Sequence, residues 1–249
     1  ASEDWEPGYR DNPDVFKRLL RREAQFQRDS RDYLAGLGNR AQKFVFWDAY
    51  QRLKADDIDI IVSIDDGQWD TESQQFMGST IDDFITIEML GMEAAEKIYK
   101  IPVGVAGSNA AVIKQATDYA GTLIKQQLNP TSREIIRQSI ATSIKLGEPR
   151  TQATARLQRT ITNIQRADMI AQTETVGAFG RGNLAYAKIA GAFEKTWRTS
   201  LGPCPICADI PKQGAIPIDQ PFITGRGNLV MHQGAHPYCR CRVVYNFPH

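Results

Sequence analysis

The thiol chemistry of this sequence is concentrated near its C-terminus. Cys204 and Cys207 stand in "CPIC", and His236, Cys239 and Cys241 follow in "HPYCRC". All four cysteines of the 249-residue chain therefore lie in its last fifth, with two of its three histidines close by. A cysteine that serves only as a small apolar core residue has no reason to cluster, so the clustering indicates a chemical role.

The spacing of these residues predicts a metal site. A gap of two residues, as between Cys204 and Cys207, lets a tight turn aim two thiolates at one ion, and His236 and Cys239 have the same gap. Tetrahedral zinc needs four ligands. One set is Cys204, Cys207 and His236 with Cys239 or Cys241; the other takes all four cysteines and leaves His236 outside. Either set would bind a structural zinc, which would cross-link a small β unit that has few hydrophobic residues.

Other uses of the cysteines are open but less favoured. The thiols can be reduced and metal-free, or paired in disulfides. A redox role for "CPIC" calls for a strand-to-helix junction in a βαβ setting, whereas the surrounding residues indicate a hairpin. A catalytic zinc needs an open coordination position, which four protein ligands do not leave.

Composition is typical of a soluble folded chain, with 42% hydrophobic and 24% charged residues. No apolar stretch approaches the roughly 20 residues of a membrane helix, and the polar N-terminal segment lacks a signal-peptide pattern. We therefore expect a cytoplasmic protein without a membrane partner, in which disulfides are disfavoured.

The charge is distributed unevenly along the chain: residues 51–100 carry 12 acidic and 4 basic side chains, and residues 125–200 carry 5 acidic and 12 basic side chains. The basic part can face solvent, an acidic partner or nucleic acid.

The sequence pattern predicts an α+β protein, with a mainly α-helical body and a small C-terminal β-hairpin unit that binds zinc. Asn12 and Pro13 are expected to start the first helix, and Thr131 or Ser132 to cap another. Glycines within the last predicted helix indicate close packing of a neighbour. Three regions are expected: helical residues 1–110, a helical region 111–191, and the β unit 192–249. Helices are predicted over residues 12–34, 41–55, 79–99, 109–128, 129–149, 150–162 and from 163 to about 190; residues 58–70 are a strand or, as we favour, a helix; and strands are expected within 193–200, 215–219, 221–224 and 241–247.

At this point the chain resembles the phage Mu F-like (MuF) minor capsid or head morphogenesis proteins of tailed double-stranded DNA phages. The resemblance covers roughly residues 129–247. It is carried by the helix 166–191, "KTW" (195–197), "CPIC", "IPID" followed by Phe222, and "HPYCRC". One departure is "AQTET" (171–175), where many members have "ARTET". Any role of an arginine at that position is therefore absent here.

The resemblance implies a virion component present in few copies, made in the host cytoplasm and placed in the head interior or at the portal vertex. It implies contacts with the portal and other head proteins, and a part in head morphogenesis, DNA packaging or DNA ejection. The family is also implied to hold a metal through its Cys/His residues, which correspond here to Cys204, Cys207, His236, Cys239 and Cys241. We expect Glu174, Arg166 and Arg181 to orient the long helix, and Trp197 to anchor the core of the β unit.

Two further functions compete with a structural role. Some phage proteins transfer ADP-ribose, and Glu174 with "WRTS" (197–200) loosely imitates the residues for that chemistry. No other catalytic motif or cofactor loop is present, so we expect no enzyme activity and no catalytic residues. The second alternative is non-specific binding of packaged DNA through the phosphate-contacting arginines of the basic helices. These are Arg133, Arg137, Arg156, Arg159 and Arg166.

Overall fold

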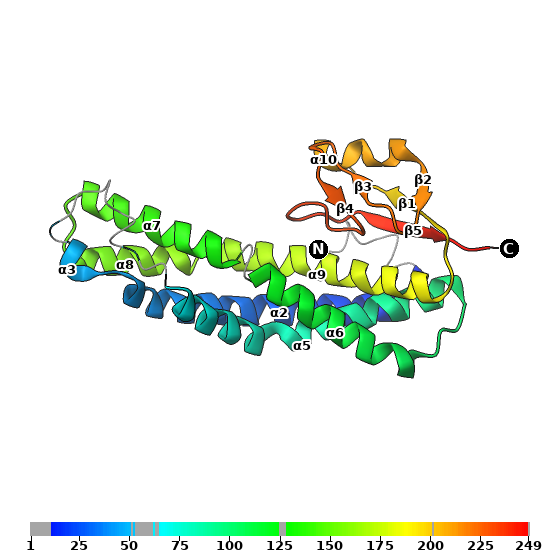
Figure 1. Ribbon diagram of the computed structural model, residues 1–249, viewed down its shortest axis with the longest axis horizontal. Helices are drawn as coiled ribbons and strands as arrows, with labels where there is room; N and C mark the ends of the chain where they lie inside the picture. Colours follow the sequence, from blue (N-terminus) through cyan, green and yellow to red (C-terminus); the bar gives the residue numbers. More distant parts are fainter. Residues whose placement is uncertain are drawn as a thin grey trace. The chain divides into compact units, whose positions relative to one another are not determined.

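The computed structural model describes residues 11–50, 52, 62, 65–124, 128–200 and 202–248. The chain is mainly helical, with a small antiparallel sheet near its C-terminus (Figure 1), which confirms the predicted α+β class. The helices are α2 (Pro13–Arg40), η1 (Ala41–Phe44), α3 (Trp47–Tyr50), α5 (Asp66–Tyr99), α6 (Val105–Leu123), α7 (Asn129–Lys145), α8 (Arg150–Ile161), α9 (Ile164–Ile189), α10 (Pro205–Ala208) and η4 (Ile210–Gln213). The strands are β1 (Glu194–Arg198), β2 (Ala215–Pro217), β3 (Phe222–Ile223), β4 (Leu229–Val230) and β5 (Arg242–Asn246).

The chain forms two compact units, each assembled from separated segments. Unit 1 comprises Ala1–Phe26, Asp82–Thr117 and Met169–His249, and unit 2 comprises Gln27–Ile81 and Asp118–Asp168. Helices α2, α5, α6 and α9 contribute residues to both. The sequence analysis predicted three continuous regions, 1–110, 111–191 and 192–249. The two units are instead defined by contacts between separated segments, so these regions stay a prediction. Among the described residues, no helix is long and apolar enough to cross a membrane.

The start of one helix and the cap of another differ from the prediction because Ser and Thr side chains form hydrogen bonds within helices. Helix α5 begins at Asp66 rather than Ser79, since the Ser79 and Thr80 hydroxyls donate to carbonyls four residues earlier, at 2.9 and 2.8 Å. Ser132 does the same with the Leu128 carbonyl at 2.7 Å, so the predicted cap at residue 131 or 132 is wrong and α7 begins at Asn129. Such back-bonding lets these residues lie in helix interiors.

The first helix begins as predicted, with Asn12 directly before Pro13, its first residue. The Asn12 carbonyl accepts the Phe16 N–H at 3.1 Å, as an N-cap residue does, while the Asn12 side chain donates to the Ala94 carbonyl at 3.5 Å. The helix predicted over 41–55 is interrupted at Val45, which forms an isolated bridge with Val62. For the segment 58–70, the helix is confirmed from Asp66, whereas residues 58–61, 63 and 64 lie outside the described residues.

Within unit 1, helix α9 is central, and every residue from 174 to 184 is buried. Its glycines allow a close crossing with α5. A Cβ on Gly182 would lie 1.9 Å from the Glu88 carbonyl oxygen, and a Cβ on Gly91 would lie 2.2 Å from that of Phe179. Each helix therefore supplies one glycine at the crossing, which confirms the predicted role of small residues in α9.

The C-terminal strands form a three-stranded antiparallel sheet in the order β2-β1-β5, and β3 pairs with β4 in a separate two-stranded ribbon. Strand β4 was not predicted. Trp197 of β1 is fully buried and packs against Phe222 with ring centroids 5.4 Å apart. Their cluster includes Leu184 and Ala187 of α9. The prediction that Trp197 anchors the core of the β unit is thus confirmed.

Candidate metal centre

The first cysteine pair lies on one short helix rather than in the hairpin that the sequence indicated. Cys204 occupies the N-cap position of α10, Pro205 follows as its first residue, and Cys207 lies within it. The Cys204 carbonyl accepts the N–H groups of Cys207 and Ala208 at 3.0 and 2.9 Å. Proline suits this first position, where no N–H is needed. One turn of backbone thus presents both thiols.

The second ligand pair is formed by a tight turn in "HPYC". The Cys239 N–H donates to the His236 carbonyl at 3.1 Å, and Pro237 occupies the second position of the turn, which its fixed φ favours. Tyr238 takes a positive φ of 61° at the third position. Turns of this kind need a positive φ there and usually place glycine or asparagine at it. A tyrosine at this position indicates that surrounding contacts hold the turn in place.

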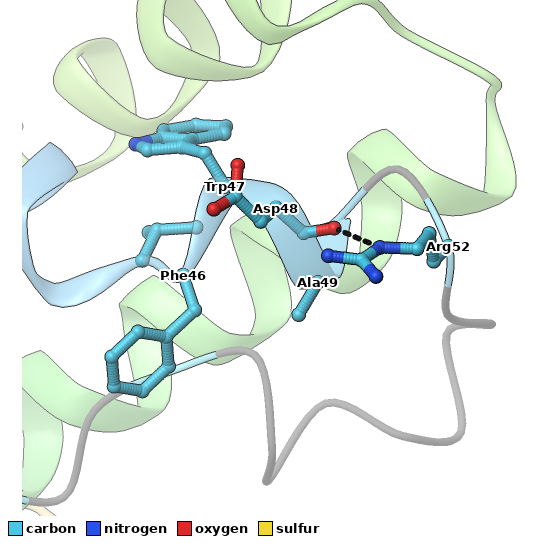
Figure 2. Close-up of a pocket in the computed structure, with 6 residues that line it drawn as sticks. Phe46, Trp47, Asp48, Ala49 and Arg52 are labelled. Atoms are coloured by element: carbon cyan, nitrogen blue, oxygen red, sulfur yellow. Dashed lines mark hydrogen bonds between the residues drawn. The ribbon is translucent and has the colours of Figure 1, made fainter.

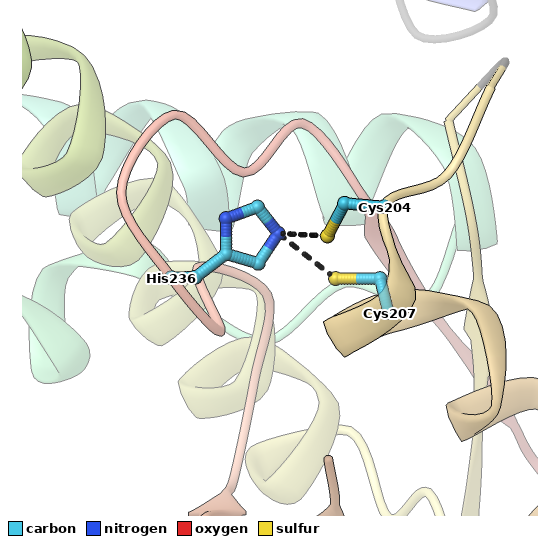
Figure 3. A group of neighbouring side chains, drawn as sticks. All are labelled: Cys204, Cys207 and His236. Carbon is cyan, nitrogen blue, oxygen red and sulfur yellow. Dashed lines mark hydrogen bonds between the residues drawn. The ribbon is translucent and has the colours of Figure 1, made fainter. Parts of the chain in front are cut away.

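The five predicted ligand residues lie in one cluster, as two groups of three that share Cys207. The Nε2 atom of His236 lies 3.1 Å from both the Cys204 and the Cys207 sulfur atoms, and Figure 3 shows the imidazole edge facing the two thiols. The Cys207 and Cys239 sulfur atoms are 3.9 Å apart. Two groups of three result, and both contain Cys207: one adds Cys204 and His236, and the other adds Cys239 and Cys241. Within each group all ligand atoms lie within 4.8 Å of one another.

The separation of two sulfur atoms fits a metal ion. Two sulfurs bound to one tetrahedral zinc at about 2.3 Å are about 3.8 Å apart, close to the Cys207–Cys239 separation of 3.9 Å. Cys207, Cys239 and Cys241 are buried, while Cys204 and His236 are partly exposed. The cluster could therefore hold a metal ion. Since Cys207 belongs to both groups, the two predicted four-ligand sets share it and both stay open.

The histidine is oriented for binding through Nε2. Its Nδ1 atom lies 2.7 Å from the Pro237 carbonyl, which can only accept a hydrogen bond. In the neutral ring Nδ1 therefore carries the proton, and Nε2 presents a lone pair to the thiols. Ligating histidines generally have such a partner on the second ring nitrogen, because it fixes tautomer and ring orientation.

The thiols are coupled to one another. Hydrogen bonds from the Cys207 and Cys241 thiols lower the pKa of Cys239, and backbone N–H groups of Ala235 and Cys241 add to this. The pKa of Cys207 is raised, first by its hydrogen bonds to Cys239 and Cys241 and then by burial. Cys239 therefore loses its proton before Cys207, which keeps its proton until a cation compensates the charge. A bound divalent ion would supply that compensation.

A buried lysine ties the loop before His236 to the sheet. Lys195 of β1 is fully buried, donates from Nζ to the Met231 carbonyl at 2.8 Å, and lies 5.3 Å from the centre of the Phe222 ring. His232, one residue further, lies with Nδ1 2.7 Å from the Gln233 carbonyl. Burial lowers the pKa of His232 to about 4, so this imidazole is neutral near pH 7. The sequence analysis did not predict the Lys195–Met231 contact, because Lys195 entered it only as part of the "KTW" motif, to which no role was assigned.

Other residues singled out in the sequence take structural positions. Arg181 pairs with the buried Glu88 of α5 in unit 1, and Glu174 is 7% exposed on α9. The Arg181–Glu88 pair agrees with a role of Arg181 in orienting the helix. Arg166 belongs to unit 2, where its Nη2 donates to the Ser132 hydroxyl at 2.8 Å.

Unit 2 has an open hollow beside the short helix α3, lined by Val45, Phe46, Trp47, Asp48, Ala49 and Arg52. Figure 2 shows the Phe46 and Trp47 rings pointing in different directions, while Arg52 Nε donates to the Asp48 backbone carbonyl at 3.0 Å. The guanidinium of Arg150 lies 4.9 Å from the centre of the Trp47 ring. These lining residues do not include a paired nucleophile and base, so the cysteine cluster is the stronger candidate site.

Comparison with known proteins gives no neighbour: the chain matches no protein-family model, and no curated protein or solved structure is significantly similar to it.

Proposed function

We propose that this chain is a minor head protein of a tailed double-stranded DNA phage, acting inside the capsid or at the portal in head morphogenesis, DNA packaging or ejection. In this proposal a structural zinc cross-links its C-terminal unit. The observation that carries it is the convergence of Cys204, Cys207, His236, Cys239 and Cys241, the same residues that carry the resemblance to the MuF proteins.

The ligand chemistry supports zinc with a structural role. Thiolates and an imidazole suit zinc better than they suit calcium or magnesium, which prefer oxygen ligands. Five candidate donors are more than a four-coordinate ion needs, so none of its positions has to be left to water. The buried sulfur atoms of Cys207, Cys239 and Cys241 belong to the apolar cluster around Trp197. In this position the ion would join residues of α10, the turn at His236 and the residues that precede β5.

Metal content and assembly test the two halves of the proposal. Protein purified without chelator should contain about one zinc per chain, and a Cys204→Ser, Cys207→Ser double variant should lose it. The portal protein encoded in the same phage genome, when co-expressed, should co-purify with the wild-type chain. An unrelated phage's portal protein provides the matched control. Zinc without portal binding would leave the metal site standing and contradict the head role.

An ADP-ribosyltransferase activity is a weaker candidate. A glutamate that activates an acceptor must be reachable by substrate, but Glu174 lies in the buried part of α9 and Trp197 lies in the core of the β unit. Labelled NAD should therefore not be turned over. Turnover that disappears in Glu174→Ala would replace the structural proposal by an enzymatic one.

Binding of packaged DNA through the basic helices is also less favoured. Within unit 2, Arg133 pairs with Asp66 at 2.9 Å and Arg156 forms two hydrogen bonds with Glu148. Arg137 lies 3.8 Å from Glu134, and Arg166 is buried. Acidic partners reduce the net positive charge that these helices present to phosphates. Most of the arginines proposed for that role already have a protein partner.

A further inference from the structure

The residue between two of the candidate ligands faces the helices instead of the metal centre. Arg240 lies between Cys239 and Cys241, and its guanidinium forms a two-pronged ion pair with Glu23 of α2. Nη1 donates to Oε2 and Nη2 to Oε1, both at 3.0 Å. The two side chains are only 7% and 12% exposed. All of these residues belong to unit 1.

Helix α9 adds two more contacts to the same loop. Arg240 Nη2 also donates to Gln172 Oε1 at 3.3 Å, and the Tyr238 N–H donates to the Thr173 hydroxyl at 3.3 Å. The backbone from 238 to 241 is thus held against α2 and α9 while the flanking cysteines face the cluster. These contacts explain how Tyr238 can keep its positive φ.

The geometry of this pair makes it a positioning device rather than a surface ion pair. Parallel N–H to carboxylate bonds fix the guanidinium in both distance and orientation. The pair is mostly shielded from water, so breaking it leaves a poorly solvated charge and the arrangement is strongly favoured over a loosened one. A fixed Arg240 backbone in turn limits where the sulfur atoms of Cys239 and Cys241 can lie.

We propose that the Arg240–Glu23 pair positions the Cys239 and Cys241 half of the metal site, so that metal binding and docking of this loop on α2 and α9 stabilise each other. The inference rests on the proposed metal site. Coupling of this kind is reciprocal: whatever docking adds to metal affinity, the metal adds to docking. Glu23 is then a determinant of metal affinity although it is not a ligand.

Cobalt binding measures the first direction of this coupling. Co²⁺ bound to thiolates absorbs visible light, and competition with a chromophoric chelator gives its affinity for the full chain. Loss of an outer partner typically weakens metal binding by about 10- to 100-fold, and we expect about 10-fold for Glu23→Gln. Arg240→Lys should weaken binding similarly, since lysine keeps the charge but cannot form the fork. Arg242→Ala is the matched control, because Arg242 lies two residues away and is 3.9 Å from Asp11 in an exposed pair.

Amide hydrogen exchange measures the reverse direction without any variant. Removing the metal from the wild-type chain should speed exchange in α2 around Glu23 and in α9 around residues 172 and 173, relative to α7 and α8. Affinity that stays within twofold in both Glu23→Gln and Arg240→Lys, or exchange that is unchanged at α2, would overturn the coupling but not the zinc site. A wild-type chain without cobalt absorption would overturn the metal site and the coupling together.

Discussion

At the scale of single residues, Lys195 is the buried charge with the clearest consequence. The side chain is fully buried, and its ammonium group contacts the Met231 carbonyl and the face of the Phe222 ring. Burial, with a smaller contribution from the charge of Lys188, lowers the pKa of Lys195 from 10.5 to about 8. The folded chain therefore releases this proton at a lower pH than the unfolded chain does.

The sign of the resulting pH dependence follows from proton linkage. Between about pH 8 and 10.5 the unfolded chain binds more protons at this side chain, so stability should rise with pH in that window. Below about pH 8 the buried ammonium is charged, and it lowers the unfolding free energy by its full amount. The difference in unfolding free energy between wild type and Lys195→Met, measured by denaturant titration, should shift in favour of wild type as pH rises from 8 to 10. Lys212→Met is the control: the hydrogen bond to Asp209 raises the pKa of this exposed lysine, so its difference should not shift in favour of wild type as pH rises. A flat difference for Lys195 would contradict its burial as a charged group.

At the scale of elements, the crossing of α5 and α9 depends on glycine. An alanine at Gly182 would drive a methyl group into the Glu88 backbone, which cannot move aside as a flexible side chain can. We expect Gly182→Ala to lower the unfolding free energy by about 2 kcal/mol or more, because overpacking forces the helices apart. The measurement is chemical denaturation followed by far-UV circular dichroism.

Gly78 offers a matched control within α5, since a Cβ there meets nothing within 4 Å. Gly78→Ala should raise the unfolding free energy by roughly 0.5–1 kcal/mol through helix propensity alone. Opposite signs for the two substitutions would separate close packing from propensity. Equal stabilisation by both would mean that the helices do not meet at Gly182.

Contacts within one turn could be predicted from the sequence, whereas contacts between distant elements could not. The cysteine cluster could be predicted because Cys204 and Cys207 share one turn and His236 and Cys239 another, so local spacing carries the geometry. The glycines of α9 indicated close packing, but not the partner helix. Arg240 and Glu23 lie 217 residues apart, and a contact over that separation has no local pattern to announce it. The start of α5 was missed because serine and threonine resemble caps until their bonding partners are known.

At the scale of the whole molecule, charge pairing bears on nucleic-acid binding. The chain has a formal net charge of only +1, and Arg133, Arg137 and Arg156 each lie beside an acidic side chain. We expect no shift of duplex DNA in a gel at low salt. A shift that weakens steeply as salt increases would instead indicate phosphate contacts and revive the DNA-binding alternative.

Metal removal tests how the C-terminal unit is stabilised within the whole chain. Cys207, Cys239 and Cys241 lie in one apolar cluster with Trp197, Phe222 and Tyr245, so an ion bound there would cross-link the core of the sheet. The helices have apolar contacts of their own, such as the ring pairs Phe26–Phe84 and Tyr33–Phe76. Chelation should therefore expose residues 192–248 to limited proteolysis and leave most far-UV helical signal intact. The Cys204→Ser, Cys207→Ser variant should already be cleaved there without chelator. Loss of helix in step with the sheet would mean that the metal stabilises the whole fold, since local and global unfolding would then coincide.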